Sequence, residues 1–343
     1  MSSQILHSSR LFCVVALALA GGAAAASHSG SQAPGLIPLE TQIAVDAAAK
    51  PHSAAAFQTQ TSVPTASFDA GMIHVDQYGS GKHALVLIPG LACGPWVWRE
   101  TIVKFSPRAT IYAITLPGFD GRAATDRKEL FASFAKDFWA MLADKDIKNP
   151  VVIGHSLGGT LAIALAEEHP ERLAGIVAVD GLPVFPTLAF ATAEQRAAAA
   201  SQFANVFASL DASKKLANQE QYMRDIGTIR SELVEPAAQC EARSDMKAVA
   251  AWIQEDLSGD LRPQLARIVI PFLEVMPYNP ADAKPPMNYS QEQTLGFYRS
   301  LVAGAPRVSV MGIAPSRHFV MLDQPAAFEK EIEDFLVSVY RPL

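Results

Sequence analysis

Short apolar runs alternate with segments of helical spacing along most of this chain, and that alternation limits the possible folds more than any other feature. The runs occupy residues 84–88, 110–115, 151–153, 176–179, 268–273 and 307–311. Apolar runs without a polar alternate are typical of strands buried on both faces. Strands that alternate with helices form parallel sheets with right-handed crossovers. The sequence therefore predicts an α/β fold with a mostly parallel central sheet flanked by helices.

One long segment interrupts this alternation. Residues 183–262 are rich in Ala, Gln and Glu and have mostly helical spacing. We interpret them as a helical cap inserted into an α/β core formed by residues 67–182 and 263–343. Within the core, 72–75 and the turn 79–81 indicate a first hairpin.

The N-terminus is typical of an exported protein. Within residues 1–26, Arg10 precedes the apolar run 11–20 and an Ala-rich end, the arrangement of a secretory signal peptide. The run is short for a membrane-spanning helix. Residues 27–66 lack apolar periodicity and are expected to form a flexible leader. We therefore expect a secreted or periplasmic protein without stable membrane insertion after cleavage.

Composition excludes several classes of partner. Without the signal peptide, 27 basic and 34 acidic residues remain, and no basic block stands out. Binding to nucleic acid is therefore not expected. The two remaining cysteines, Cys93 and Cys240, could pair in an exported protein, but one pair is not a disulfide framework. The chain shows no spacing of metal ligands and implies no cofactor or metal.

The segment Gly154-His155-Ser156-Leu157-Gly158 matches the pattern G-x-S-x-G. It lies directly after one apolar strand and directly before a helix. A sharp turn between strand and helix exposes the serine, and flanking glycines avoid side-chain clashes in that turn. Ser156 is therefore the predicted nucleophile.

The general base follows from chain order and distance. In chains with such a serine turn, the acid and then the histidine follow the nucleophile. Only His169 and His318 follow Ser156. His169 ends the helix that Ser156 begins, about 20 Å away at ~1.5 Å per residue, and is out of reach. His318 lies in the loop after the last strand, where loops converge on an active site.

Three residues compete for the acid of the triad. Asp180 ends the apolar run 176–179, Asp282 lies in the loop after the next strand, and Glu274 falls within that strand. The favoured acid is Asp180, whose alternative role is to brace the junction with the cap. The two donors of the oxyanion hole are expected to be the backbone N–H groups of Leu157 and Leu91.

Together, these motifs resemble the α/β-hydrolase superfamily. The resemblance rests on 90–91, 117–119, 154–159 and 317–319 and covers about residues 70–340. It implies an eight-stranded sheet and a Ser-His-acid triad. The chain departs from the family pattern at 276–280, where the usual Gly-x-x-Asp is missing, and this departure favours Asp180. The position of Asp180 is similar to the acid site of some haloalkane dehalogenases, but those enzymes use Asp where this chain has Ser156.

We therefore expect an exported serine hydrolase that cleaves a carboxylic ester, or a similar acyl bond, of a small molecule through an acyl-serine intermediate. A peptidase, a lactonase or another hydrolase on the same triad is the first alternative. A binding module without catalytic activity is the second, because this fold carries many functions. The sequence does not indicate an oligomeric state.

Overall fold

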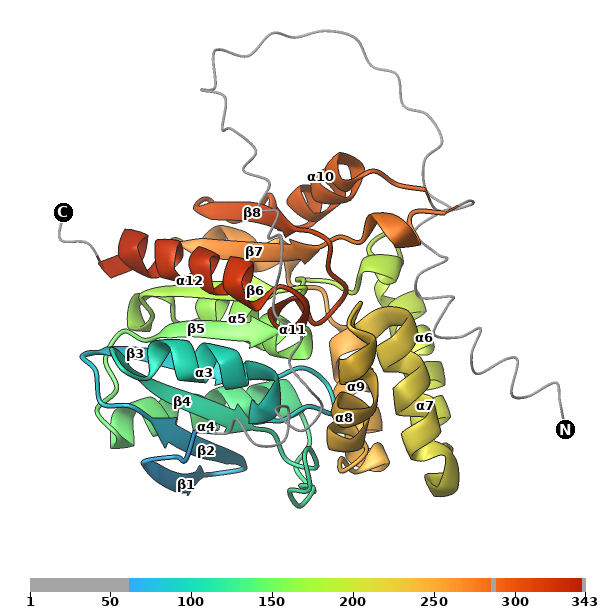
Figure 1. The fold of residues 1–343 in the computed structure, drawn as a ribbon, viewed down its shortest axis with the longest axis horizontal. Helices are drawn as coiled ribbons and strands as arrows, with labels where there is room; N and C mark the ends of the chain where they lie inside the picture. Colours follow the sequence, from blue (N-terminus) through green and yellow to red (C-terminus); the bar gives the residue numbers. More distant parts are fainter. Residues whose placement is uncertain (1–61, 285–287, 341–343) are drawn as a thin grey trace, which may run out of the picture.

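The computed structural model describes residues 62–284 and 288–340, which form an eight-stranded sheet between two layers of helices (Figure 1). The strand order is β1-β2-β4-β3-β5-β6-β7-β8, and every neighbouring pair from β4 to β8 is parallel. The strands are β1 (Ala66–Ala70), β2 (Ile73–Tyr78), β3 (His83–Ile88), β4 (Ala109–Thr115), β5 (Val151–His155), β6 (Gly175–Val179), β7 (Phe272–Pro277) and β8 (Val308–Ile313). The predicted fold class is confirmed.

Two strand boundaries differ from those expected. The segment predicted as a strand at 268–273 begins pairing only at Phe272, and β7 continues to Pro277. Pro271 has no amide hydrogen to donate, and the residues before it, Arg262–Arg267, form a 3-10 helix. The predicted hairpin turn at 79–81 was wrong: this segment leads from β2 to β3, two strands that β4 separates in the sheet. The first hairpin instead joins β1 to β2 and turns at Gly71, where φ is +60°.

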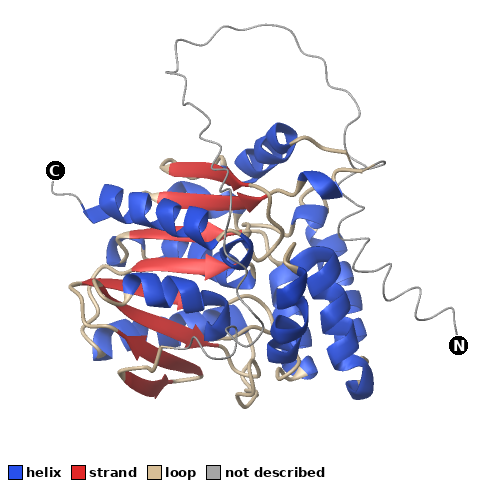
Figure 2. Cartoon of the chain, in the orientation of Figure 1, coloured by secondary structure: helices blue, strands red, loops and turns tan. Residues whose placement is uncertain are grey.

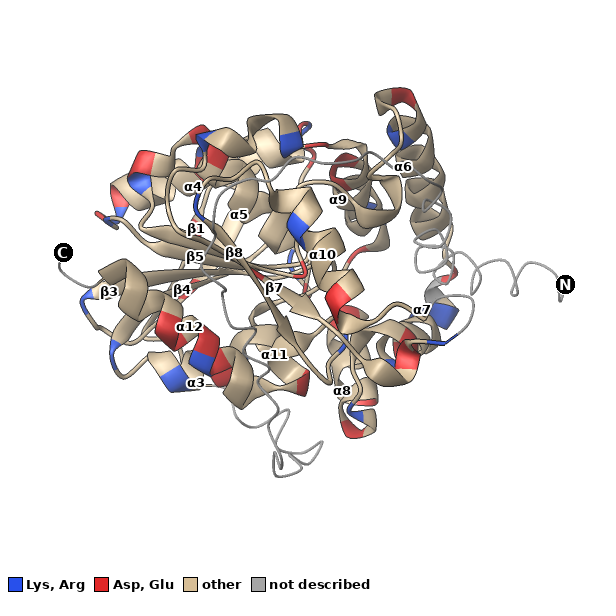
Figure 3. Cartoon of the chain, turned by 90° about the horizontal axis from the view of Figure 1, so that it is seen from above, with Lys and Arg blue, Asp and Glu red and all other residues tan. Residues whose placement is uncertain are grey.

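Helices cover both faces of the sheet, as the view from above shows (Figure 3). One layer contains α4 (Leu130–Asp144), α5 (Leu157–Glu168) and α10 (Gln291–Val302). The other contains α3 (Arg99–Phe105), α11 (Val320–Asp323) and α12 (Pro325–Tyr340). Each layer buries its own apolar core against the sheet, which explains why the strands are apolar on both faces.

Four helices lie beyond the carboxyl ends of the parallel strands (Figure 2). They are α6 (Ala193–Ala208), α7 (Lys215–Tyr222), α8 (Ser231–Glu241) and α9 (Met246–Ser258). Local sequence signals start two of them. Thr192 and Gln195 form a reciprocal capping box at the start of α6, and the Asp245 carboxylate accepts two amide hydrogens at the start of α9. These helices and the segments that connect them cover the edge of the sheet at which the parallel strands end, and together they are called the cap below.

The N-terminal predictions fall largely outside this description. The expected signal peptide, 1–26, lies outside the described residues, and so does the leader up to residue 61. Pairing begins at Thr65 and β1 at Ala66, one residue before the expected start of the core. No helix in the described part of the chain has the length and apolar character needed to cross a bilayer.

The α12 layer should be sensitive to the loss of one aromatic ring. Phe328 is fully buried and stacks on Trp98, with ring centroids 6.2 Å apart. We expect Phe328→Ala to lower the free energy of unfolding by about 3–5 kcal/mol, because it leaves a cavity in a close-packed core. Val337→Ala, on an exposed position of the same helix, is the control and should cost less than about 1 kcal/mol. Urea denaturation measures both, and equal effects would contradict this account of the layer.

Candidate active site

Ser156 occupies a sharp turn between β5 and α5. Its backbone has φ 52° and ψ −122°, a conformation that non-glycine residues rarely adopt. The turn closes only because its flanks lack side chains. A Cβ on Gly154 would lie 2.0 Å from the carbonyl oxygen of Gly158, and a Cβ on Gly158 would lie 2.2 Å from that of Ile88. The structure therefore gives a physical reason for the G-x-S-x-G spacing.

His318 and Asp180 are in direct contact, although 138 positions separate them. The Nδ1 of His318 lies 2.5 Å from Oδ2 of Asp180. Asp180 follows β6, the strand next to β5, and has a positive φ of 50° that turns it out of the strand. His318 lies in the loop between β8 and α11. With Nδ1–H donating to the carboxylate, Nε2 keeps its lone pair for a proton.

The structure places the two alternative acids elsewhere. Asp282 accepts hydrogen bonds from the guanidinium of Arg317, with N–O distances of 2.6 and 2.7 Å. Burial alone would raise the pKa of Asp282, but hydrogen bonds from Arg317 and Asn279 outweigh it and lower the pKa. Glu274 is fully buried in β7, opposite Ala178. Burial first, and the charge of Asp180 second, raise the pKa of Glu274 well above its usual range.

Two further residues, Tyr298 and His155, hold Asp180 and His318 in place. The Tyr298 hydroxyl, from α10, donates to Oδ1 of Asp180, the oxygen that His318 does not use. His155, inside the serine turn, donates from Nε2 to the backbone carbonyl of His318 at 3.0 Å. Burial, and then the neighbouring His318, lower the pKa of His155 well below its usual value, so its ring is neutral. No local pattern marks Tyr298, because it approaches from a different helix.

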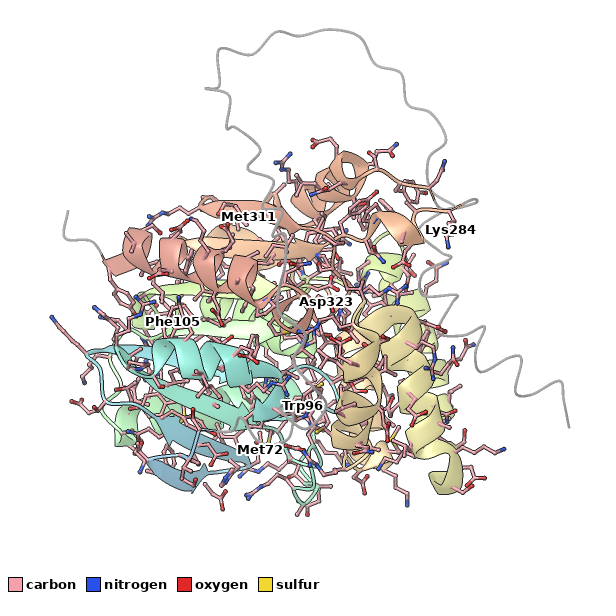
Figure 4. All side chains as sticks on the ribbon, viewed as in Figure 1. Met72, Trp96, Phe105, Lys284, Met311 and Asp323 are labelled. Carbon is pink, nitrogen blue, oxygen red and sulfur yellow. The ribbon has the colours of Figure 1, made fainter. Side chains whose placement is uncertain are left out.

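The loop that carries His318 is bonded to the cap. The amides of His318 and Phe319 donate to the carbonyls of Ile226 and Gly227, at 3.2 and 2.9 Å. Asp323, labelled in Figure 4, joins the same two segments. Its carboxylate accepts from the amides of Arg317, at 2.8 Å, and Ile229, at 3.1 Å, and from the Thr228 hydroxyl. The segment between α7 and α8 thus fixes the loop that carries His318.

Ser156, Asp180 and His318 line one cavity of about 350 Å³, between the sheet edge and the cap. That volume lies within the range of small-molecule pockets. Leu91 and Leu157, the predicted oxyanion residues, line the same cavity. Leu157 is the first residue of α5, and the first amides of a helix have no partner within it. Most of the wall is apolar: Ala92, Leu182, Val184, Phe185, Phe203, Phe207, Ile226, Val249, Ile253 and Leu257.

Two further carboxyl groups from the cap line this cavity. Glu241 ends α8, and burial raises its pKa to about 8. Asp256 lies on α9, and burial raises its pKa to about 7, against a hydrogen bond from Thr160 that lowers it. The Sγ of Cys93 donates to Oε1 of Glu241 at 3.7 Å. Cys93 and Cys240 are both free thiols, so no disulfide joins the cap to the core there.

Comparison with known proteins agrees with this architecture. A pimeloyl-[acyl-carrier protein] methyl ester esterase from Edwardsiella ictaluri is 27% identical over 199 residues, 57% of this chain and 74% of the relative. One from Legionella pneumophila (strain Corby) is 33% identical over 113 residues, 33% of this chain and 44% of the relative. This chain therefore spans under half the length of the second relative. The enol-lactonase from Burkholderia xenovorans LB400 has the same fold, with a TM-score of 0.62 and 16% identity over 77% of this chain and 96% of that chain.

The alpha/beta hydrolase family model matches residues 85–331. The match includes the serine turn, Asp180, the cap and His318, and it extends over well more than half of the sequence. The chain therefore belongs to the alpha/beta hydrolase family of hydrolytic enzymes.

Proposed function

We propose that this protein is a serine esterase that cleaves a carboxylic ester, or a similar acyl bond, through an acyl-serine intermediate. The observation that carries the proposal is that Ser156, His318 and Asp180 line the same cavity, with Nδ1 of His318 2.5 Å from Oδ2 of Asp180. Such an arrangement combines a nucleophile, a base and a group that orients the base.

In the proposed first step, the Oγ of Ser156 attacks the ester carbonyl while Nε2 of His318 takes its proton. The Asp180 carboxylate holds Nδ1–H and stabilises the imidazolium that forms. The backbone N–H groups of Leu91 and Leu157 donate to the developing oxyanion. His318 then protonates the leaving alcohol, and the acyl-serine forms. In the second step, His318 takes a proton from water while the water oxygen attacks the acyl carbonyl. His318 then returns that proton to the Oγ of Ser156 as the bond between this oxygen and the acyl carbon breaks, and the carboxylic acid leaves.

The cavity favours a small or medium-sized substrate with an apolar body. Its volume of about 350 Å³ and its mostly aliphatic and aromatic wall support this size and character. The named relatives act on the methyl ester of a pimeloyl chain, which is consistent with ester cleavage. The buried carboxyls of the cap distinguish this cavity from a purely apolar one.

Labelling with a fluorophosphonate probe tests the nucleophile and the base. We expect the wild-type protein to be labelled, because the probe reacts with an activated serine. Ser156→Ala should abolish labelling, and His318→Ala should reduce it by at least about a thousandfold in rate, since the serine loses its base. Ser201→Ala, at an exposed position of the cap, is the control. A folded wild-type protein that stays unlabelled and cleaves no ester would instead favour a binding module.

The acid is tested by comparing three carboxamide variants. Asp180→Asn should lower kcat by about 10³–10⁴, because an amide in place of the carboxylate favours the wrong tautomer of His318. Asp282→Asn, whose carboxylate pairs with Arg317 at the surface, should stay within a few-fold of the wild type. Glu274→Gln replaces a buried side chain that does not contact His318 by one of equal size, and it should also change kcat far less than Asp180→Asn. A loss at Asp282 or Glu274 that equals the loss at Asp180 would overturn the assignment.

We also propose that the protein is exported, on the strength of the N-terminal segment 1–26. Expression of the full chain in a bacterial host should yield a processed form whose mass corresponds to cleavage after Ala26. That form should appear in the periplasmic or extracellular fraction. An unprocessed chain retained in the cytoplasm would contradict the proposal, and Arg10→Glu, which removes the positive charge before the apolar run, should slow processing.

A further inference from the structure

Glu241 is a buried acid that neither the fold nor the proposed mechanism uses. It is 2% exposed and lies at the C-terminal end of α8, with its side chain on the cavity wall. One carboxyl oxygen, Oε1, accepts from Cys93. The other, Oε2, has no hydrogen-bond partner among the described residues. A buried carboxyl oxygen without a partner is costly, so a ligand that donates to Oε2 would remove an existing penalty.

Among the described residues, the groups next to Glu241 include no Lys or Arg that could act as this donor. The titratable groups that face it are Cys93, from the loop after β3, Tyr222, at the end of α7, and Cys240, on its own helix. Among the described residues that line the cavity, none is Lys or Arg, while Asp180, Glu241 and Asp256 are acids. The described lining of the cavity thus offers several carboxyl acceptors and no Lys or Arg side chain of its own.

Glu241 is also close to the reacting groups. Cys93, which contacts it, is two residues beyond Leu91, the proposed oxyanion donor. Tyr222, which interacts with it electrostatically, has its ring 6.5 Å from that of His318. A substrate whose ester carbonyl lies at Ser156 can therefore place a second polar group against Glu241 without leaving the cavity.

We propose that Glu241 is a specificity-determining residue that selects esters bearing an amino group. Two observations support this choice: Oε2 of Glu241 has no hydrogen-bond partner among the described residues, and no Lys or Arg among them lines the cavity. The inference rests on the proposed esterase function and names its substrate class. The substrate ammonium would donate to Oε2, a charge-assisted bond stronger than one between neutral groups. An ester that also carries a carboxylate would be rejected, because no Lys or Arg in the described lining of the cavity can pair with it.

Binding of an ammonium group should expel a proton from Glu241. With a pKa of about 8, the neutral carboxyl outnumbers the carboxylate about tenfold at pH 7 in the empty cavity. A bound ammonium favours the carboxylate, so the carboxyl proton passes to the buffer. Below pH 8, loss of this proton costs part of the free energy of amine binding. The affinity of the protein for the amine should therefore rise as pH increases from 6 toward 8.

The first experiment compares kcat/KM for four methyl esters: methyl hexanoate, methyl 3-aminohexanoate, methyl 6-aminohexanoate and monomethyl adipate. In the wild type, at least one amino ester should exceed methyl hexanoate by about tenfold or more, and monomethyl adipate should be the poorest. In Glu241→Gln, which keeps the size and can keep the contact with Cys93, the amino advantage should shrink to about threefold or less. Glu235→Gln, which removes an exposed acid from the same helix, is the matched control and should keep the advantage.

Three results would overturn the assignment to Glu241. The first is that neither amino ester is better than methyl hexanoate in the wild type. The second is an amino advantage that survives in Glu241→Gln, and the third is an advantage that disappears only in Asp256→Asn. If none of the esters is cleaved and the fluorophosphonate does not label Ser156, the esterase proposal has failed, and the second experiment still tests Glu241.

The second experiment measures binding without catalysis. Calorimetry with hexylamine, hexan-1-ol and hexanoate should show hexylamine binding to Ser156→Ala protein about tenfold or more tighter than hexan-1-ol, and hexanoate weakest. At pH 7, in buffers of different ionisation enthalpy, hexylamine should release close to one proton. In the Ser156→Ala, Glu241→Gln double variant, this release should vanish. Equal affinity for amine and alcohol, or binding without proton release, would contradict the proposal, because a purely structural Glu241 moves neither quantity.

Discussion

The strained turn at Ser156 is the constraint on which the rest of the site depends. It holds the serine above the carboxyl edge of the sheet, in a conformation that closes only because Gly154 and Gly158 leave room for the backbone on either side. The same turn starts α5, whose first amides face the position of the proposed oxyanion. The turn follows β5, which pairs with a buried strand on each side, β3 and β6, and its position sets where the other groups of the candidate site must converge.

The cap both covers the candidate site and positions His318. Backbone hydrogen bonds join the loop that carries His318 to the segment between α7 and α8; they run from His318 and Phe319 to Ile226 and Gly227. The Asp323 carboxylate links the same two segments. His155 holds the same loop from the sheet side. The orientation of His318 is therefore set jointly by core and cap. A change in the segment between α7 and α8 should therefore affect the proposed proton transfer from Ser156 to His318 as well as the access of substrate.

Chemistry and selectivity come from different parts of the molecule. The sheet edge supplies the proposed triad and oxyanion donors, and it belongs to a fold that this chain shares with an enol-lactonase and that carries many chemistries. The cap supplies most of the apolar wall together with Glu241 and Asp256. The cap residues are therefore expected to determine which substrates are accepted. Glu241, whose Oε2 has no partner among the described residues, distinguishes this cavity from a purely hydrophobic pocket.

The sequence by itself determined the features that local physics controls. Uninterrupted apolar runs predicted the parallel sheet, glycine spacing predicted the turn at Ser156, and helix length excluded His169 in favour of His318. The boundaries of β7 were wrong because pairing with β6, rather than apolar character, decides where a strand begins. The sequence favoured Asp180 over Asp282 and Glu274, but only the tertiary structure shows which carboxylate meets Nδ1 of His318. That contact depends on how neighbouring strands bring distant loops together. Tyr298, His155 and Glu241 acquired their positions in the same way, from elements whose contacts arise only when sheet, helices and cap pack against one another.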